Sequence, residues 1–242
     1  MLSDTEARNA LIVALDCDRA RALELTDLLA DHARWVKVGM TLFYRYGPGI
    51  VQEMKDRGFN VFLDLKVHDI PFQVHGAVRS ASLSGADIIS IHALGGSHMI
   101  ASGRSGAAEA AEVRGVGEKG RTKLVAISIL TSMNEEDLSS IGVRDTVASE
   151  VERLAKLSYN AGADGLVCSA QEASSMREIL GPEALIITPG IRPRGAEKGD
   201  QQRTATPASA IAAGASKLVI GRPITEAKDP CVTFEEIVNE LI

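Results

Sequence analysis

Four ionisable side chains directly follow a short apolar run in the stretch VFLDLKVHDI, residues 61–70. Asp64, Lys66, His68 and Asp69 lie within six positions, and residues two apart in a strand face the same side. Asp64 and Lys66 should therefore point together. Because nearby opposite charges favour the charged form, a lysine beside carboxylates is expected to stay protonated and could serve as a general acid.

Two further charges occupy equivalent places in the two preceding apolar runs. Lys37 is the polar residue of WVKVG (35–39), and Asp16 ends LIVALD (11–16). A buried ion pair that only holds the strand ends together is the alternative interpretation, but such a pair often stabilises a protein no better than apolar residues of similar volume. Charges at the ends of three successive runs favour a catalytic cluster instead.

A second group of residues is suited to binding an anion. The stretch TPGIRPRGAEKGDQQR (188–203) has no hydrophobic pattern, and a segment of this length inside a compact domain is usually functional or disordered. We interpret it as a phosphate-binding lid, with IGRPIT (220–225) as its counterpart. Arg192 and Arg222 could bind the anion, and Gly221 would allow close backbone approach. Solvated surface charges are the alternative interpretation of the two arginines.

Polar residues close to these groups have less specific patterns. In ILTSMNEEDLSSIG (129–142), we interpret Thr131 as a ligand contact and Asn134 as the N-cap of a short helix. His68 and His92 each come at the end of an apolar run. We interpret both histidines as structural, with a general base as the alternative for His68.

Eight short apolar runs recur along the chain, and such runs are typical of parallel strands buried on both faces. The stretches between them have helical patterns. In residues 150–162, for example, Val151, Leu154 and Leu157 share one face and Gly162 can end the helix. The eight predicted strands are 10–15, 35–39, 61–65, 87–92, 123–130, 164–169, 184–189 and 217–221.

A repeated joint supports the same architecture. SGADIIS (84–90), AGADGLV (161–167) and AGASKLV (213–219) share a Gly-Ala step that leads into a strand. Recurring joints imply recurring βα units, so the sequence predicts an α/β fold, a (β/α)8 TIM barrel, as a single domain over residues 1–242. A doubly wound open sheet is the alternative, but no Gly-x-Gly-x-x-Gly follows the first run. In barrels of this kind the loops after the strands carry the active site.

Composition and charge exclude several functions. The net charge is −6 without a basic tract, which argues against nucleic acid or an anionic membrane as a partner. No apolar stretch approaches the roughly 18 residues that span a bilayer, and the first residues do not resemble a signal peptide. Three cysteines without metal-ligand spacing fit a reducing cytoplasm. We therefore expect a cytoplasmic protein that acts on a small molecule.

Together these motifs resemble the orotidine 5′-phosphate decarboxylase family in its bacterial form, almost from end to end. The most specific matches are Asp-x-Lys-x-x-Asp-Ile-Pro (64–71), LTSM (130–133), TPGIRP (188–193) with GDQ (199–201), and GRPIT (221–225). The resemblance implies a homodimeric barrel without cofactor or metal. It also implies a carbon-carbon lyase that converts orotidine 5′-phosphate to UMP and carbon dioxide, the last step of de novo UMP synthesis.

The resemblance gives each charged residue a role. Lys66 would protonate C6 of the pyrimidine after carbon dioxide leaves, and Asp64 would lie beside the substrate carboxylate. Lys37 would join the charged cluster and contact the ribose. Asp16 would bind the ribose hydroxyls. Lys66, Asp64 and Lys37, together with Asp69, would be the catalytic residues, and Asp16 would be a substrate contact.

Residues beyond this cluster complete the implied site. Asp69 and Ile70 would enter the active site of the other subunit. The sequence departs from the family at Val67, where Phe is common, and at Phe72 and Gln73, where Asn-Thr is usual, so polar contacts from positions 72 and 73 are not expected. The remaining substrate contacts would be Thr131, Pro189, Arg192, Gln201, Gly221 and Arg222.

Two other functions stay open. The Asp-x-Lys-x-x-Asp string also occurs in related magnesium-dependent 3-keto-gulonate 6-phosphate decarboxylases and hexulose phosphate synthases, which need a further acidic ligand near the mouth of the barrel. Here Lys37 and Asp16, next to Cys17, occupy the neighbouring strand ends. A catalytically silent phosphate-binding barrel is the other alternative, although such a module has no evident use for a proton donor between carboxylates.

Overall fold

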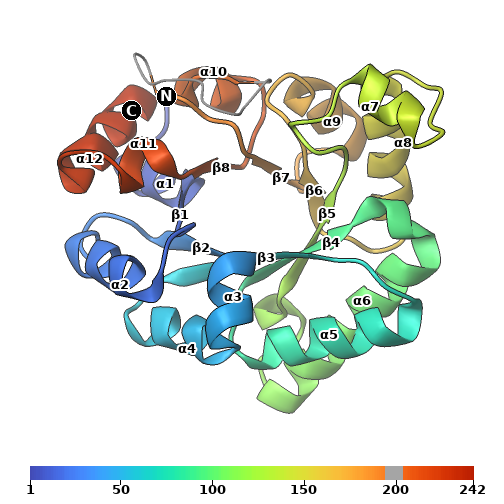
Figure 1. Cartoon of the computed structure of the whole chain (residues 1–242), viewed down its shortest axis with the longest axis horizontal. Helices are drawn as coiled ribbons and strands as arrows, with labels where there is room; N and C mark the ends of the chain where they lie inside the picture. Colours follow the sequence, from blue (N-terminus) through green and yellow to red (C-terminus); the bar gives the residue numbers. More distant parts are fainter. Residues whose placement is uncertain (194–203) are drawn as a thin grey trace.

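Eight parallel strands close into a barrel that is surrounded by helices (Figure 1). The computed structural model describes residues 1–193 and 204–242. Each strand pairs with the next along the chain, and β8 pairs with β1, which confirms the predicted (β/α)8 barrel and excludes the open sheet. The strands are β1 (Leu11–Ala14), β2 (Trp35–Gly39), β3 (Asn60–Val67), β4 (Ile88–His92), β5 (Lys123–Ile127), β6 (Gly165–Val167), β7 (Leu185–Thr188) and β8 (Lys217–Ile220).

Helices follow every strand, and one precedes the first. In the described part of the chain, none of them is both long and apolar enough to cross a membrane. Two 3-10 turns, Ala93–Gly95 and Glu118–Gly120, flank α6. The helices are α1 (Asp4–Ala10), α2 (Arg19–Leu28), α3 (Met40–Tyr46), α4 (Gly49–Asp56), α5 (Pro71–Leu83), α6 (Gly96–Arg114), α7 (Glu135–Ser140), α8 (Val147–Asn160), α9 (Ala173–Leu180), α10 (Pro207–Ala212), α11 (Arg222–Thr225) and α12 (Pro230–Leu241).

The repeated Gly-Ala joint has the same backbone geometry three times. Gly85, Gly162 and Gly214 have φ angles of 95°, 98° and 97°, a left-handed region that residues with a Cβ rarely adopt. The polar residue two positions after each glycine then accepts a hydrogen bond from a backbone N–H of the preceding strand. The pairs are Asp87 with Val61 (2.7 Å), Asp164 with Leu124 (2.7 Å) and Ser216 with Ile186 (3.1 Å).

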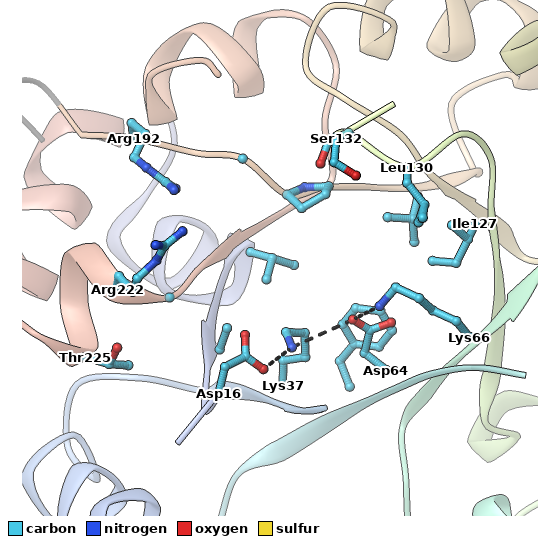
Figure 2. Close-up of a pocket in the computed structure, with 18 of the residues that line it drawn as sticks. Asp16, Lys37, Asp64, Lys66, Ile127, Leu130, Ser132, Arg192, Arg222 and Thr225 are labelled. Atoms are coloured by element: carbon cyan, nitrogen blue, oxygen red, sulfur yellow. Dashed lines mark hydrogen bonds and ion pairs between the residues drawn. The ribbon is translucent and has the colours of Figure 1, made fainter. Parts of the chain in front are cut away.

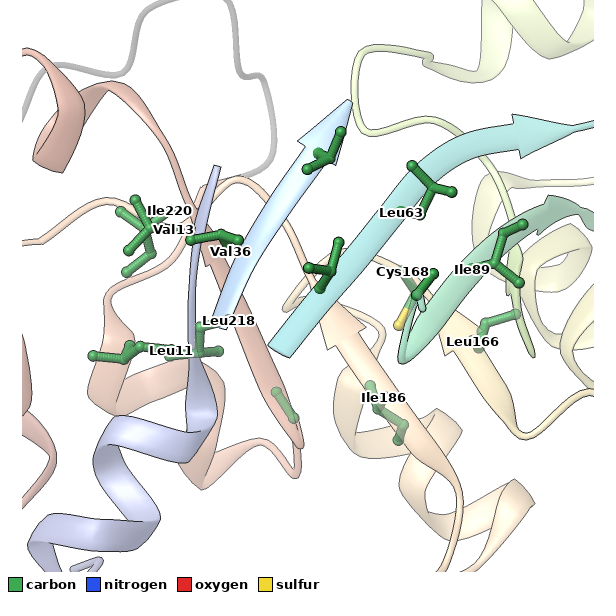
Figure 3. Packing of buried hydrophobic residues seen from close by; sticks show 14 of the residues in the cluster. Leu11, Val13, Val36, Leu63, Ile89, Leu166, Cys168, Ile186, Leu218 and Ile220 are labelled. Atoms are coloured by element: carbon green, nitrogen blue, oxygen red, sulfur yellow. The ribbon is translucent and has the colours of Figure 1, made fainter. Parts of the chain in front are cut away.

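Alternation along the strands produces two apolar layers. Leu11 and Val13 of β1 belong to the large cluster between the strands and the surrounding helices, part of which is shown in Figure 3. Ile12 and Ala14 belong to a smaller cluster inside the barrel, together with Phe62 of β3. Removal of this apolar surface from water contributes about 25 cal/mol per Å². The inner cluster is also the floor on which a site at the strand ends can be built.

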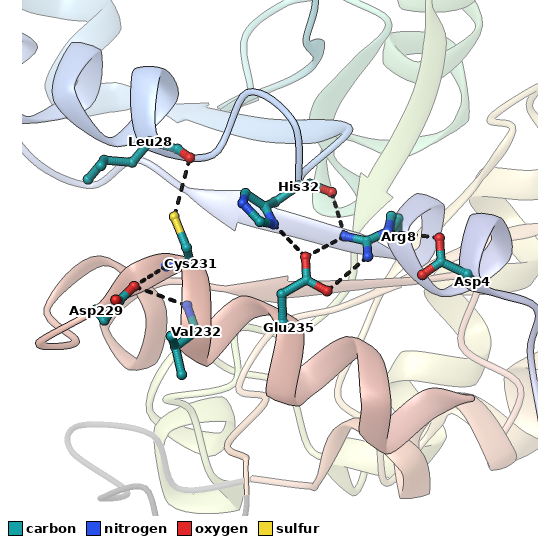
Figure 4. A network of polar contacts seen from close by, with 8 residues as sticks. All are labelled: Asp4, Arg8, Leu28, His32, Asp229, Cys231, Val232 and Glu235. Atoms are coloured by element: carbon teal, nitrogen blue, oxygen red, sulfur yellow. Dashed lines mark hydrogen bonds and ion pairs between the residues drawn. The ribbon is translucent and has the colours of Figure 1, made fainter.

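An ion-pair network joins both ends of the chain (Figure 4). Arg8 of α1 donates two hydrogen bonds to the carboxylate of Glu235 in α12, at 2.7 and 2.8 Å, and one to the carbonyl of His32 at 3.2 Å. The Nδ1 atom of His32 lies 2.5 Å from the same carboxylate. The N–H of Leu2 donates to the carbonyl of Leu241 at 3.0 Å, so the two termini lie side by side (Figure 1).

Strand β3 is irregular where it carries its charges. Its register against β4 shifts between Leu63 and Val67, so that residues 64–66 stand opposite Ser90 alone. Lys66 has a φ of 52° and is the one non-glycine residue with positive φ in the described chain. This conformation costs a residue with a side chain about 1–2 kcal/mol. The regular alternation of side chains between the two faces of the strand is therefore interrupted before it reaches Lys66.

Candidate active site

A pocket of about 690 Å³ opens at the carboxyl ends of the strands. The apolar side chains of Phe62, Ile127 and Val167 belong both to the inner barrel cluster and to the pocket wall. Such a floor excludes water and strengthens electrostatic interactions above it. The structure brings nine predicted site residues to this pocket: Asp16, Lys37, Asp64, Lys66, Thr131, Pro189, Arg192, Gly221 and Arg222.

Opposite charges alternate along one wall of the pocket (Figure 2). The Nζ atom of Lys66 lies 2.7 Å from Oδ2 of Asp64, and Nζ of Lys37 lies 2.7 Å from Oδ1 of Asp16. Lys37 is also 3.8 Å from Oδ2 of Asp64, which links the two pairs. The predicted meeting of Asp64 and Lys66 is confirmed, although the β3 bulge rather than regular alternation brings it about.

Asp64 lies at the centre of this charged cluster, between the ammonium groups of Lys37 and Lys66. Its side chain is only 11% exposed. Burial by itself raises the pKa of this carboxyl, but the ammonium groups of Lys37 and Lys66 and the hydroxyl of Ser90 outweigh it and hold the pKa below its usual value. Asp64 therefore remains a carboxylate at neutral pH, and the site keeps a fixed negative charge beside the Lys66 ammonium.

Two arginines stand at the other end of the pocket from Lys66 (Figure 2). Arg192 follows β7, and Arg222 begins α11 directly after β8. The pKa of the Arg192 guanidinium lies below its usual value, because partial burial and the like charge of Arg222 both disfavour its charged form. Two like charges held in one pocket favour an anionic ligand such as phosphate.

Some predicted residues are not brought to the pocket of their own chain. Asp69 and Ile70 are exposed, and the Asp69 carboxylate accepts a hydrogen bond from the N–H of Ile70 at 2.7 Å. Gln201 and most of the predicted lid, residues 194–203, lie outside the described residues. A contribution of these residues to the site therefore stays a prediction.

The less specific predictions have mixed outcomes. Asn134 caps α7, where its side chain accepts from the N–H of Asp137 at 2.9 Å, as predicted. The rings of His68 and His92 stack with centroids 5.3 Å apart. Burial, followed by the neighbouring His68 and Lys66, lowers the pKa of His92. His92 is therefore neutral at neutral pH, and the structural role predicted for it stays a prediction.

Sequence reasoning missed two residues that shape the cluster from behind. A Cβ atom on Gly39 would come 2.8 Å from Oδ1 of Asp16 and 3.1 Å from Nζ of Lys37. Ser90, which is fully buried, hydrogen-bonds to Asp64. The sequence could have indicated Gly39, because this residue lies two positions after Lys37 in the same strand and so faces the same side. No sequence pattern indicates Ser90, since only the shifted register of β3 places it opposite the charges.

The donors in the pocket do not form a metal cage. Within residues 1–193 and 204–242, no group of three or more His, Cys, Asp or Glu side chains is arranged to hold a metal ion. The carboxylates of Asp16 and Asp64 instead contact the ammonium groups of lysines. The site is thus suited to charge stabilisation and proton transfer by side chains.

The fold and the site define a class of protein: a (β/α)8 barrel with two arginines after β7 and β8 and a charged cluster at the ends of β1, β2 and β3, all facing one pocket. A profile of the orotidine 5′-phosphate decarboxylase / HUMPS family matches residues 9–237. The chain belongs to this family.

Named relatives agree with the family over nearly the whole chain. An orotidine 5′-phosphate decarboxylase of Vibrio cholerae is 48% identical over 233 residues, which cover 96% of this chain and 98% of that protein. The enzyme of the same name from Aliivibrio fischeri is 46% identical over 228 residues, 94% of each protein. The crystal structure of orotidine 5′-phosphate decarboxylase from Lactobacillus acidophilus matches with a TM-score of 0.83 and 36% identity, covering 96% of this chain and 99% of that one.

Proposed function

We propose that this chain is an orotidine 5′-phosphate decarboxylase, which converts orotidine 5′-phosphate to UMP and carbon dioxide and so completes UMP synthesis. The observation that carries the proposal is the arrangement of Asp16, Lys37, Asp64 and Lys66 as alternating charges in the same pocket as Arg192 and Arg222. Membership of the family supports the same reaction.

The chemical step needs a cation and a proton at one place. When the bond between C6 and the carboxylate breaks, its electron pair stays on C6 and carbon dioxide leaves. The Lys66 ammonium stabilises this developing anion and then donates its proton to C6, and the amine regains a proton from water. Two unit charges about 4 Å apart interact by about 4 kcal/mol at an effective dielectric constant near 20. An ammonium that is already in place supplies this stabilisation without reorganisation.

Asp64 holds the ammonium and faces the substrate carboxylate. The 2.7 Å contact to Lys66 fixes the position of the proton donor. A carboxylate forced beside another carboxylate is relieved when carbon dioxide leaves, and this repulsion adds to the effect of Lys66. Lys37 and Asp16, which share a 2.7 Å ion pair, bind the ribose hydroxyls.

The phosphate is held far from the reacting carbon. Arg192 and Arg222 bind the phosphate, Gly221 allows its close approach, and Gln201 closes the site as part of the lid over residues 188–203. Pro189 and Thr131, which line the pocket, contact the pyrimidine end. Binding energy from a remote group can be used to hold the reacting centre in position.

We further propose a homodimer in which each chain completes the other's site. Asp69 and Ile70 lie outside their own pocket, and large apolar side chains at the start of α5 and in the turn after β4 are exposed. Ile70 is 64% exposed and Phe72 is 83% exposed, and Leu94 in the next loop is 41% exposed. Exposed apolar groups of this size favour a protein interface. The partner's Asp69 would then flank Lys66.

Direct turnover tests the reaction. The purified protein should convert orotidine 5′-phosphate to UMP with equal rates before and after treatment with EDTA, because lysines occupy the places that a metal would need. The alternative is the metal-assisted chemistry of the HUMPS members of the family. Activity that EDTA abolishes and magnesium restores would favour that alternative, and a protein that leaves orotidine 5′-phosphate unchanged under both conditions would contradict the proposal.

Mixed dimers test the shared site. Lys66→Ala and Asp69→Ala should each be inactive alone. After subunit exchange, one site of every mixed dimer carries neither substitution, so activity should return to about a quarter of the wild-type value per total protein, because half of the dimers are mixed and half of their sites are intact. Exchange that is verified with labelled chains but restores no activity would contradict the shared site.

A further inference from the structure

The bulge in β3 leaves one backbone donor and one carboxylate oxygen in need of partners. Opposite three β3 residues, 64–66, β4 offers a single residue, Ser90. Its neighbours Ile89 and Ile91 belong to the outer apolar cluster, so alternation turns the Ser90 side chain toward the inside of the barrel. Ser90 has no exposed surface and does not line the pocket.

A single hydroxyl satisfies both groups. Ser90 Oγ accepts a hydrogen bond from the backbone N–H of Lys66 at 2.8 Å and donates one to Oδ1 of Asp64 at 2.8 Å. The directions are fixed, because an N–H can only donate and an ionised carboxylate can only accept. Lys66 then bonds Oδ2 of the same carboxylate through its side chain. Backbone, hydroxyl, carboxylate and ammonium thus form a closed ring of contacts.

We propose that Ser90 is a positioning residue, whose hydroxyl fixes the left-handed backbone of Lys66 against the Asp64 carboxylate and so sets where the ammonium stands. Ser90 acts through these two residues and does not touch substrate. The inference rests on the proposed decarboxylation for its kinetic part. Its structural part, the coupling of Lys66 and Asp64, holds whatever the substrate.

The left-handed conformation is the reason that the hydroxyl matters. Lys66 is strained at a φ of 52°, and strained residues persist only where the surroundings hold them. The hydrogen bond to Ser90 is the contact that replaces the ladder bond lost at the bulge. Without it, the strain can relax by rotation of the Lys66 backbone, and the ammonium moves away from Asp64.

Three variants distinguish a positioning role of Ser90 from a general loss of structure. Ser90→Ala removes one oxygen atom and both hydrogen bonds. Ser90→Thr retains the hydroxyl and tests rescue. Ser128→Ala is the matched control, because Ser128 is equally buried, directly after the neighbouring β5, but donates to the backbone carbonyl of Val167 in β6 instead of to a charged side chain. Circular dichroism and melting curves establish folding, and Ser90→Cys replaces the alanine variant should that one not fold.

The first readout needs no turnover. In ¹³C NMR titrations the pKa of the Asp64 carboxyl should rise in Ser90→Ala, because a donor to the ionised form is lost, and amide exchange at Lys66 should accelerate at least about tenfold. The other ionisable groups near this cluster, Lys37 from β2 with its partner Asp16 after β1 and the neutral His92 from β4, are unchanged by the substitution. Ser128→Ala should leave both measurements as in the wild type.

The second readout is kinetic. In Ser90→Ala, kcat should fall about 10- to 100-fold, a typical cost of removing a group that orients a reactive one, while KM changes less than about threefold because the arginines are untouched. The acidic limb of the pH–rate profile should move to higher pH with the raised pKa of Asp64, and Ser90→Thr should restore most of kcat. An inactive wild type would refute the proposed function and leave the NMR readout intact. Unchanged Asp64 titration and Lys66 exchange in Ser90→Ala, or the same changes in Ser128→Ala, would overturn the role of Ser90.

Discussion

Replacement of Lys66 by alanine is the most informative change that the proposed mechanism allows. The substitution removes the ammonium 2.7 Å from Asp64 and leaves Lys37, at 3.8 Å, as the remaining cation beside that carboxylate. Loss of about 4 kcal/mol of charge stabilisation corresponds to about three powers of ten in rate, at about 1.4 kcal/mol for each. Loss of a general acid is worth a further factor of about 10²–10⁴. Because one group supplies both effects, the two factors multiply, and we expect kcat to fall about 10⁵- to 10⁷-fold.

A second lysine provides a matched control for this experiment. Lys55 of α4 also forms a 2.7 Å ion pair with an aspartate, Asp87, and its side chain is 26% exposed against 30% for Lys66. Lys55 does not line the pocket, so Lys55→Ala should retain kcat within about threefold. The assay is release of UMP under saturating substrate, with the oligomeric state checked by size-exclusion chromatography. A loss below tenfold for folded, dimeric Lys66→Ala would refute the role of Lys66 as cation and proton donor.

The remaining predictions concern three other parts of the molecule. Gly39→Ala should lower kcat at least about tenfold with a nearly unchanged melting temperature, because its Cβ displaces flexible side-chain ends of the charged cluster rather than backbone; an unchanged kcat would contradict this. Arg222→Ala should raise KM for the full substrate yet react with a substrate that lacks the phosphate at the wild-type rate, and a difference on that truncated substrate would place Arg222 elsewhere. The hydrogen bond from Arg8, only partly opposed by burial, lowers the pKa of Glu235 to about 2. A carboxyl whose pKa is lower in the folded state stabilises the fold above its ordinary pKa and loses this contribution as pH falls from about 4.5 toward about 2. Urea unfolding should therefore show a shallower loss of stability over this range in Glu235→Gln than in the wild type, and equal slopes would contradict the linkage.

Most of the barrel was predictable because its signals are local. Short apolar runs mark strands that are covered on both faces, and all eight appear in the closed sheet. The repeated Gly-Ala step marks the return from helix to strand, since the glycine at Gly85 and its two counterparts must adopt a positive φ. The position of the site then followed from the fold, because the polar residues Lys37 and Asp64 interrupt strands near their carboxyl ends.

The fine geometry of the site could not be predicted, because it depends on contacts between strands. The alternation rule places Asp64 and Lys66 together for a regular strand, whereas the real strand is bulged and Lys66 is left-handed. The partner that makes this possible, Ser90, lies 24 residues further along the chain. No pattern in residues 61–70 indicates which residue of β4 will stand opposite the bulge.

The two ends of the pocket are built differently, so substitutions at the two ends should change different kinetic constants. Lys37, Asp64 and Lys66 stand on adjacent strands of the closed sheet, and their ion pairs are already formed without substrate. Preformed charges of this kind stabilise a transition state without reorganisation. Arg192 lies in the segment after β7 and Arg222 begins α11, so both stand beyond the closed sheet. Substitutions of the charged residues on β2 and β3 should therefore act mainly on kcat, and substitutions of the two arginines after β7 and β8 mainly on KM, because charges fixed in the closed sheet serve the reaction and remote contacts to the anion serve capture.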